Sequence, residues 1–379
     1  MKRYLKRLEK RLLKKKSKVR KVQNSERMIK ISLALITKNE QENIQICLNN
    51  IGNLADEIVI VDTGSTDRTL EILTKQPHVK LFQIKWENDF SKARNYAIDQ
   101  CTGDYILVLD ADEYITFGKR NELEKVMKQN QIGRIKIVSK FKKDGEEFEA
   151  SSYISRFFPN SVRYKGAIHE QLDSTLPRVD MKLTVSHSGY FDKDKSARNI
   201  PILLQELEKH PKDAYFHYQL GKEYRLSKSF NKSWDHLQKA YELVKHHDAF
   251  YNQLILELLQ TGKELVNKET IIVIRENEQS LNNVTDFHFY KGLFYLDYCL
   301  NNLNEAIHLL PKIEASFTAC LNISKKKHTE YLSGTGSFLA LYNLGVYHEA
   351  IGSMVEAKRN YMKSANLGYE PAKKRLAAI

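Results

Sequence analysis

The sequence predicts an α/β domain with a mainly parallel sheet flanked by helices, followed by an all-α domain of helical repeats. Two observations carry this prediction. Apolar runs alternate with helical patterns from residue 31 to about 130, and the pattern is almost wholly helical after about residue 194. A chain of 379 residues is long enough for two domains with separate cores. We therefore expect a basic segment at 1–29, a sheet domain at 30–193 and a helical domain at 194–379.

Four buried strands and two helices are expected in the first part of the sheet domain. The strands are short apolar runs, namely "ISLALIT" (31–37), "EIVIVD" (57–62), "VKLFQI" (79–84) and "YILVLD" (105–110). Helical spacing follows the first two strands, at Ile44, Cys47, Leu48 and Ile51 and again at Leu70 and Leu73. Strands that alternate with helices imply a parallel sheet, which binds ligands at the carboxyl ends of its strands. From residue 133 to about 192 the pattern loosens into shorter β-like pieces.

The helical half contains a recurring motif. "YQLGKEY" (218–224) returns as "YNLGVYH" (342–348), with a looser copy at 290–307. An alanine follows the motif's glycine at a similar distance in both clear copies, at Ala240 and at Ala365. These pieces resemble tetratricopeptide repeats, which stack helix pairs and commonly bind partners or form homo-oligomers. Helical packing without a partner would explain the motif equally well.

The positive charge is concentrated at the start of the sequence. The formal net charge is +13, and residues 1–30 contain 14 Lys/Arg and 2 Glu. The rest of the chain is almost neutral, so we expect no nucleic-acid-binding surface there. Leu5, Leu8 and Leu12 share one helical face among these cations, a pattern typical of a helix that rests on anionic lipid or binds an acidic partner. A solvated tail is an equal alternative.

Composition favours a cytoplasmic protein, at the inner face of the membrane if the basic segment binds lipid. No apolar run approaches the roughly 18 residues that a membrane span needs. The basic start is not followed by the continuous apolar segment of a signal peptide. The four cysteines are far apart in the sequence and lack metal-type pairing, so we expect reduced thiols.

Three acids, Asp110, Asp112 and Glu113, follow the fourth strand within four positions. Two known motifs explain only part of this region. "IVIVDTGST" (58–66) matches the aspartic-protease signature, but those enzymes need two such aspartates and only one copy is present. "LVLDADEY" (107–114) resembles the motif of haloacid-dehalogenase-like phosphotransferases, but that motif opens its fold, whereas three strands precede it here.

A third interpretation accounts for more of the residues. Asp110 and Asp112 form a D-x-D pair at a strand end, which can hold Mn²⁺ or Mg²⁺ and, through the metal, a diphosphate. Further polar residues lie at or before neighbouring strand ends: Asn39 and Glu40 after the first strand, Asp62 after the second, and Asp89, Arg94 and Asn95 before the fourth.

Residues 31–115 resemble the nucleotide-binding half of a family-2 glycosyltransferase of the GT-A fold. The segments "TKNE", "VDTGSTDRT", "DFSKARN" and "LDADE" occur in that family's order and spacing. "KGAIHEQL" (165–172) and "SHSGY" (186–190) resemble the segments that complete the site in a subgroup with helical repeats behind the catalytic domain. The resemblance extends over about 31–192, and it implies a GT-A-like domain followed by tetratricopeptide-like repeats.

The resemblance implies a nucleotide-sugar site, a metal site and a catalytic base. The nucleotide-sugar residues would be Thr37, Asn39, Glu40, Asp62, Arg94 and Asp110. Asp110 and Asp112 would hold Mn²⁺ or Mg²⁺, and His187 is a further candidate ligand. Glu170 would take the acceptor proton, with His169 as a second catalytic candidate, although a surface turn would also explain this pair.

The resulting hypothesis is a metal-dependent, inverting glycosyltransferase that transfers a hexose from a UDP-sugar to a cell-envelope glycan or its lipid-linked precursor. The alternative acceptor is a peptide or protein, through S- or O-glycosylation. "KWENDFSKARN" and "KGAIHE" are similar to segments of enzymes that glycosylate bacteriocin precursor peptides of the sublancin type. The non-enzymatic alternative is a helical-repeat binding scaffold with an inactive nucleotide domain. Asp110, Asp112 and Glu170 argue against a scaffold, which has no use for these charges.

Overall fold

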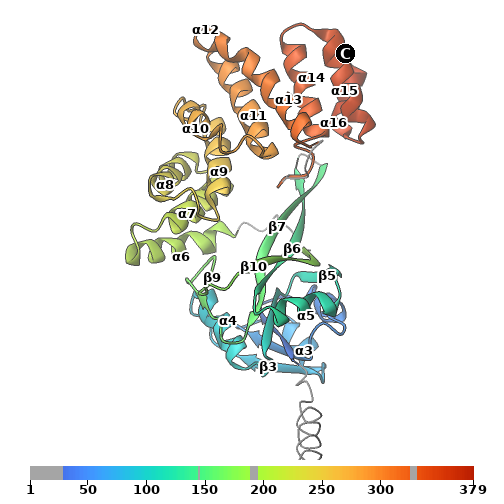
Figure 1. Ribbon diagram of the computed structural model, residues 1–379, viewed down its shortest axis with the longest axis vertical. Helices are drawn as coiled ribbons and strands as arrows, with labels where there is room; N and C mark the ends of the chain where they lie inside the picture. Colours follow the sequence, from blue (N-terminus) through green and yellow to red (C-terminus); the bar gives the residue numbers. More distant parts are fainter. Residues whose placement is uncertain (1–28, 144–145, 188–194, 325–330) are drawn as a thin grey trace, which may run out of the picture.

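The computed structural model describes residues 29–143, 146–187, 195–324 and 331–379. A strand-rich part is followed by a curved row of helices (Figure 1). The expected basic segment lies almost wholly outside the described residues, as does the expected boundary at 193/194. The last strand before that boundary ends at His187, and the first described helix after it begins at Ser196. None of the helices in the described ranges has both the length and the apolar character to cross a membrane.

Eight strands form one sheet in the order β3-β2-β1-β4-β7-β6-β10-β5. Their bounds are β1 (Ile31–Thr37), β2 (Glu57–Asp62), β3 (Val79–Gln83), β4 (Tyr105–Asp110), β5 (Glu113–Phe117), β6 (Ile132–Lys143), β7 (Glu146–Pro159) and β10 (Arg178–His187). β8 (Tyr164–Lys165) and β9 (Gln171–Leu172) pair separately. The first four strands are parallel, as the sequence predicts. The later strands make the sheet mixed, because β7 runs antiparallel to β4 and β6, and β5 runs antiparallel to β10.

Helices cover both faces of the parallel half of the sheet. On one face, α2 (Ile44–Asn49), α3 (Thr69–Thr74) and α5 (Arg120–Lys128) bury apolar residues against Leu33 and Leu107. On the other face, α4 (Phe90–Asp99) packs against Val59 and Val108. A strand buried on both faces needs apolar residues at every position, which explains the continuous apolar runs in the sequence.

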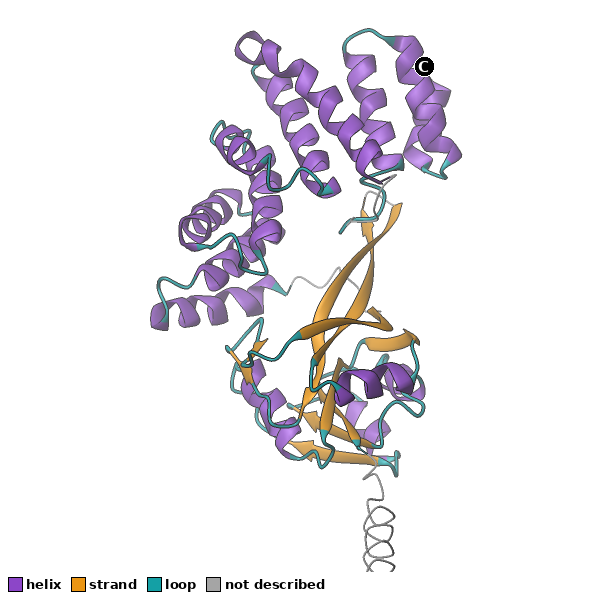
Figure 2. Ribbon diagram, in the orientation of Figure 1, coloured by secondary structure: helices purple, strands orange, loops and turns teal. Residues whose placement is uncertain are grey.

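β6 and β7 form a long hairpin that rises from the sheet toward the later helices (Figure 2). Near its tip, Ala150 of β7 forms an antiparallel bridge with Leu332. The segment around Leu332 is itself held by Asp286, which is 1% exposed. Asp286 accepts hydrogen bonds at 2.9 Å from the backbone nitrogens of both Tyr331 and Leu332. One buried carboxylate thus fixes the segment that pairs with the hairpin.

Replacing Asp286 with alanine is expected to loosen the contact between the hairpin and the helices. The change leaves two backbone donors without a partner, so we expect the free energy of unfolding to fall by about 2–3 kcal/mol. Urea unfolding measures this loss, and hydrogen exchange should accelerate at residues 149–151 and 331–333. Asp286→Asn keeps one acceptor oxygen and should have a smaller effect. Unchanged exchange at Leu332 in Asp286→Ala would show that the carboxylate is not what holds this segment.

The helical half consists of helix pairs packed side by side. The helices are α6 (Ser196–Lys209), α7 (Ala214–Leu226), α8 (Phe230–Leu243), α9 (Tyr251–Glu264), α10 (Thr270–Asn277), α11 (Thr285–Asn301), α12 (Leu303–Ala306), the short 3₁₀ helix η1 (Ile307–Leu309), α13 (Leu310–Ser324), α14 (Phe338–Ala350), α15 (Met354–Asn366) and α16 (Glu370–Ala378). The repeat motif places a glycine where two helices touch. A Cβ atom on Gly221 of α7 would lie 2.6 Å from Leu237 Cγ of α8. A Cβ atom on Gly345 of α14 would lie 2.5 Å from Tyr361 Cδ1 of α15.

Candidate active site

The candidate site lies where the carboxyl ends of β1, β2 and β4 meet. The strand register places Thr37 beside Asp62 and Ile36 beside Asp110. A cavity of about 280 Å³ opens at this edge of the sheet. Its wall includes six of the predicted site residues, which are Thr37, Glu40, Arg94, Asp110, Asp112 and His187. Trp86 and Phe90 add an aromatic wall, with ring centroids 4.7 Å apart.

The other two predicted nucleotide residues, Asn39 and Asp62, shape the loops beside this cavity. Asp62 Oδ1 accepts hydrogen bonds at 2.9 Å from the backbone nitrogens of Gly64 and Ser65. Asn39 has a positive φ of 57°, and its side-chain oxygen accepts from Thr66 N at 2.8 Å. Asp62 therefore shapes the turn that follows β2, and Asn39 links that turn to the end of β1. A role in base recognition remains a prediction for Asp62.

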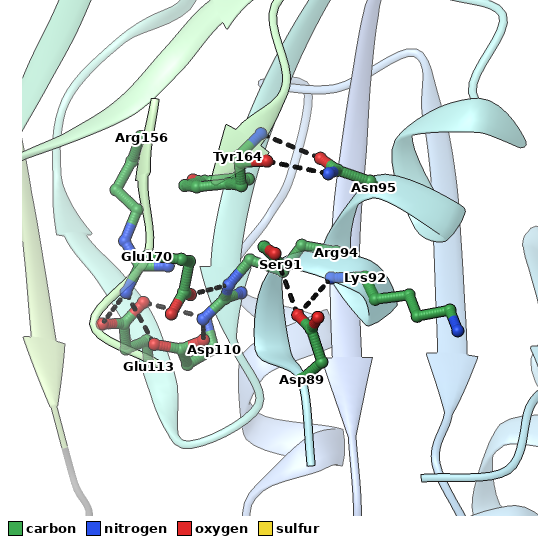
Figure 3. Close-up of polar contacts among 10 residues, drawn as sticks. All are labelled: Asp89, Ser91, Lys92, Arg94, Asn95, Asp110, Glu113, Arg156, Tyr164 and Glu170. Carbon is green, nitrogen blue, oxygen red and sulfur yellow. Dashed lines mark hydrogen bonds and ion pairs between the residues drawn. The ribbon is translucent and has the colours of Figure 1, made fainter. Parts of the chain in front are cut away.

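Asp110 lies between two arginines (Figure 3). Its Oδ1 accepts from Arg94 Nη2 at 2.7 Å, and its Oδ2 accepts from Arg156 Nη2 at 2.6 Å. Arg94 Nε also donates to Glu170 Oε1, and Arg156 Nη2 lies 3.5 Å from Glu113 Oε1. The guanidinium groups of Arg94 and Arg156 therefore lie between the carboxylates of Asp110, Glu113 and Glu170. The arginine side chains are only 8% and 10% exposed, so these pairs are shielded from water.

Burial and the arginines together set the charge states in this cluster. Burial alone would raise the pKa of Asp110, but Arg156 and Arg94 hold that pKa well below its ordinary value, so the group stays ionised. Burial raises the pKa of Glu113 to about 7; Arg156 opposes the rise, and the charge of Asp110 adds to it.

Three buried donors in the cluster have no hydrogen-bond partner among the described residues. They are Arg94 Nη1, Arg156 Nε and the Tyr164 hydroxyl. The Tyr164 ring also packs on the Arg94 guanidinium, with 5.8 Å between Arg94 Cζ and the ring centroid. Buried donors without partners are costly, so this wall of the cleft suits a ligand rich in oxygen acceptors.

Asp112 and His187 lie together, with 3.0 Å between Asp112 Oδ2 and His187 Nε2, and their role as metal ligands stays a prediction. Hydrogen bonding to Asp112 raises the pKa of His187. Asp110 does not join them, because both of its oxygens accept from arginines. In the described part of the chain, no three Asp, Glu, His or Cys side chains gather in a way that could hold a metal ion. Asp112 and His187 could supply two ligands of a divalent cation, with water and diphosphate oxygens as its other ligands. Asp110 fits better as the counter-ion of the arginines.

The structure separates the predicted catalytic pair. Glu170 accepts a hydrogen bond from Arg94 Nε, and the same guanidinium donates to Asp110. His169 has a positive φ of 49°, and its Nε2 lies 3.5 Å from Glu223 Oε1 on α7. The His169 side chain forms no hydrogen bond or ion pair with Asp110 or Glu170, although all three residues line the same 840 Å³ cavity. His169 therefore lies at the junction with the helical half, and only Glu170 belongs to the charged cluster.

Sequence reasoning missed Arg156, Lys195 and Arg198. Arg156 stands in the aromatic stretch "ISRFF" of β7, where a single cation in a buried strand is the signal that could have marked it. Lys195 and Arg198, at the start of α6, line the 280 Å³ cavity from the helical half. Nothing in their local sequence distinguishes them from solvated surface cations.

Comparisons with known proteins identify a family for part of the chain. Residues 32–175 match the family model Glycosyl transferase family 2. A TPR repeat-containing protein of Synechococcus elongatus is 33% identical over 212 residues, which cover 51% of this chain and 52% of that protein. The SPbeta prophage-derived glycosyltransferase SunS of Bacillus subtilis is 29% identical over 300 residues, which cover 74% of this chain and 70% of that protein. The chain thus spans about half the length of the first of these two relatives.

Similarity to solved structures is weaker. The structure of S. aureus TarS 1–349 in complex with UDP-GlcNAc aligns over 71% of this chain and 89% of that chain, with 15% identity and a TM-score of 0.31. The family model covers the strands from β1 to β9, and the second relative covers 74% of the chain, which extends beyond that domain. The chain therefore carries a domain of glycosyl transferase family 2, followed by tetratricopeptide-like helical repeats.

Proposed function

We propose that this chain is an inverting glycosyltransferase that transfers a hexose from a UDP-sugar, and that its active site is the cleft around Asp110. The family 2 domain supports glycosyl transfer. The observation that carries the proposal is the buried cluster in which Arg94 links Asp110 to Glu170. The Arg94 guanidinium thus lies between Glu170, the carboxylate proposed to act on the acceptor, and Asp110, the carboxylate expected near the donor.

The proposed reaction is a single displacement at the anomeric carbon. The acceptor oxygen or sulfur attacks the anomeric carbon, and the bond between this carbon and the β-phosphate oxygen breaks. The electrons of that bond leave with UDP. Glu170 accepts the proton of the acceptor. Its Oε2 suits this role, because Oε1 accepts from Arg94 and Oε2 has no hydrogen-bond partner among the described residues. One displacement inverts the configuration at the anomeric carbon.

Positive charge is needed where UDP departs. A Mn²⁺ or Mg²⁺ ion held by Asp112 and His187 would offset the charge that develops on the diphosphate. Lys195 and Arg198 line the same cavity, and neither has an ion-pair partner among the described residues. The Arg198 guanidinium stacks on Phe90, with 5.0 Å between Arg198 Cζ and the ring centroid. We expect both cations of the helical half to face the diphosphate.

Two acceptor classes fit this chemistry, a cell-envelope glycan with its lipid-linked precursors and a polypeptide. Both offer the hydroxyl group that the displacement needs, and a polypeptide also offers a thiol. A binding scaffold without activity fits less well, because a buried cluster of charges costs desolvation energy that a scaffold would have no reason to retain.

The proposal is tested by UDP release from a panel of UDP-hexoses in the presence of Mn²⁺. Asp112→Asn should lower the rate by about 100-fold or more, since it removes a charged ligand of the proposed cation. Chelation of the metal should do the same to the wild type. Asp173→Asn is a matched control, because Asp173 is exposed and pairs only with Lys165 at 3.1 Å. If no donor releases UDP, or if Asp112→Asn equals the wild type, the proposed function is wrong.

A further inference from the structure

Strand β7 has a free edge that leads to the candidate active site. One edge of β7 pairs with β6 along almost the whole strand. The other edge pairs with β4 at residues 157–159 and with the segment 331–333 near Ala150. Between these two contacts, no described residue pairs with 152–156 on that side. Ladder pairing between β4 and β7 ends at the Leu107–Phe157 pair. The next residue of β7, Arg156, contacts Asp110 of the candidate site.

The free edge presents backbone hydrogen-bonding groups into the gap. Ser151 N donates to Tyr331 O at 3.3 Å, which shows that residue 151 points its backbone groups away from β6. Backbone direction alternates along a strand, so Tyr153 and Ser155 point the same way, whereas Ile154 points to its partner on β6. The N–H and C=O groups of Tyr153 and Ser155 have no partner among the described residues on this edge.

Two cavities adjoin residues 150–156 of β7, and Arg134 of β6 lines both of them. A cavity of about 840 Å³ reaches from Tyr153 to Asp110 and Glu170. A second cavity, of about 850 Å³, continues from Tyr153 to Tyr331. An extended chain advances about 3.3 Å per residue, so the free stretch 152–156 spans roughly 16 Å. The two cavities together therefore have room for an extended segment along the whole gap.

The opposite wall of these cavities carries acceptor groups from the helices. Gln219 of α7 lines the first cavity, and Gln253 of α9 lines the second. The side-chain carbonyl oxygen of each is buried and accepts no hydrogen bond from the described residues. Buried amide oxygens without donors are uncommon, and each glutamine would have to turn its side chain to present this oxygen to a segment in the cavity. The cleft thus offers backbone groups on one side and glutamine side chains on the other.

The cavities also carry uncompensated positive charge. Arg178 and Lys222 line the first cavity, and Lys136 lines the second. None of the three has a carboxylate within ion-pair distance among the described residues. Three acidic residues line these cavities: Asp110 and Glu170 are paired with arginines, and Glu149, in the second cavity, is not without a partner either. The free charge in the cleft therefore favours a segment that carries acidic side chains.

We propose that the acceptor is an extended polypeptide segment with acidic residues, which pairs with the free edge of β7 at 152–156 and delivers a Ser, Thr or Cys side chain to Glu170. This inference rests on the proposed glycosyl transfer. Strand addition to an exposed edge is an established mode of peptide binding, in which the main chain supplies the hydrogen bonds. Both flanking partners of this edge run antiparallel to β7, so the acceptor does the same. A glycan lacks the alternating N–H and C=O groups that this edge matches.

Binding is tested first without donor, by amide hydrogen exchange of the full chain. The probe is a synthetic library of 14-residue peptides that is enriched in Asp and Glu and has Ser, Thr or Cys at the central position. Exchange at Tyr153 and Ser155 should slow by at least about tenfold, while exchange at Ile154, which already faces β6, should not change. A library enriched in Lys and Arg is the matched control. Unchanged exchange at Tyr153 and Ser155 would overturn the proposal.

Transfer is tested next with the same libraries and a labelled UDP-hexose. Tyr153→Pro removes the outward N–H and leaves the β6 pairing intact, a position where a strand tolerates proline. We expect Tyr153→Pro to lower peptide labelling by at least about tenfold. The variant loses one hydrogen bond, and the proline ring keeps the acceptor backbone away from the strand. Asp173→Asn, at an exposed residue outside both cavities, is the control and should label peptide within about threefold of the wild type. Equal labelling by the wild type and Tyr153→Pro would overturn edge pairing.

Two further outcomes separate this inference from the proposed function. If the wild type releases UDP but labels only a glycan or a polyol phosphate, the polypeptide acceptor is wrong and the glycosyltransferase stands. If the wild type neither binds nor cleaves any UDP-hexose, the proposed function is wrong. In that case the hydrogen-exchange result still decides whether a polypeptide occupies the β7 edge.

Discussion

Replacement of Arg94 by methionine is expected to lower glycosyl transfer by about 100- to 1,000-fold and to destabilise the fold by about 3–5 kcal/mol. Arg94 bonds both Asp110 and Glu170, and its side chain is 8% exposed. Methionine fills a similar volume but leaves the two carboxylates with less opposing charge in a buried site. UDP release measures the first effect and urea unfolding measures the second.

Two further variants distinguish charge from geometry at this position. Arg94→Lys keeps the charge but lacks the planar fork that reaches both carboxylates, so its activity should lie between those of the wild type and Arg94→Met. The double variant Arg94→Met/Glu170→Gln should regain part of the lost stability and none of the activity, because it removes one of the unpaired charges. Wild-type stability and activity in Arg94→Met would show that the cluster around Asp110 is not the site.

Glu170→Gln is expected to lower kcat by about 100- to 10,000-fold, the range associated with loss of a general base. Glutamine keeps the acceptor oxygen that Arg94 Nε bonds, so the cluster should remain folded and the Kd for the UDP-sugar should not change. Steady-state kinetics with an acceptor gives kcat, and calorimetry gives the Kd of the donor.

The neighbouring His169 provides the control for Glu170. His169→Gln changes a side chain that contacts Glu223 of α7 at 3.5 Å and does not contact the charged cluster. We expect it to alter kcat by less than tenfold, well below the effect of losing a general base. A larger loss from His169→Gln than from Glu170→Gln would reverse the roles of these two residues.

The parallel half of the sheet could be predicted from the sequence, and so could the position of Asp62 and Asp110 at its edge. The runs at 31–37, 57–62 and 105–110 are apolar at nearly every position, and only a strand covered on both faces needs that composition. Parallel strands bring their carboxyl ends to one edge, so Asp62 and Asp110 had to lie near one another. These expectations followed from local pattern and chain direction alone.

Features that depend on distant contacts could not be read from the sequence. The register between β6 and β7 shifts at Arg156, between the pairs Gly133–Phe157 and Arg134–Ser155, and no local pattern encodes this irregularity. The bridge between Ala150 and Leu332 joins residues that are far apart in the chain, without a shared periodicity. His169 is directed to α7 by a left-handed backbone conformation, which is uncommon for a residue other than glycine.

The two attachments of the helical half limit how its number of repeats can change in evolution. At one end, Ile168 packs with Leu203 and Phe216 of α6 and α7. At the other end, Leu332 holds the hairpin tip. Repeat arrays ordinarily gain or lose units with little consequence, because each unit touches only its neighbours. Here the helices between the two attachments must keep a fixed span, so insertions and deletions of repeats should be found among relatives after Leu332 and not before it.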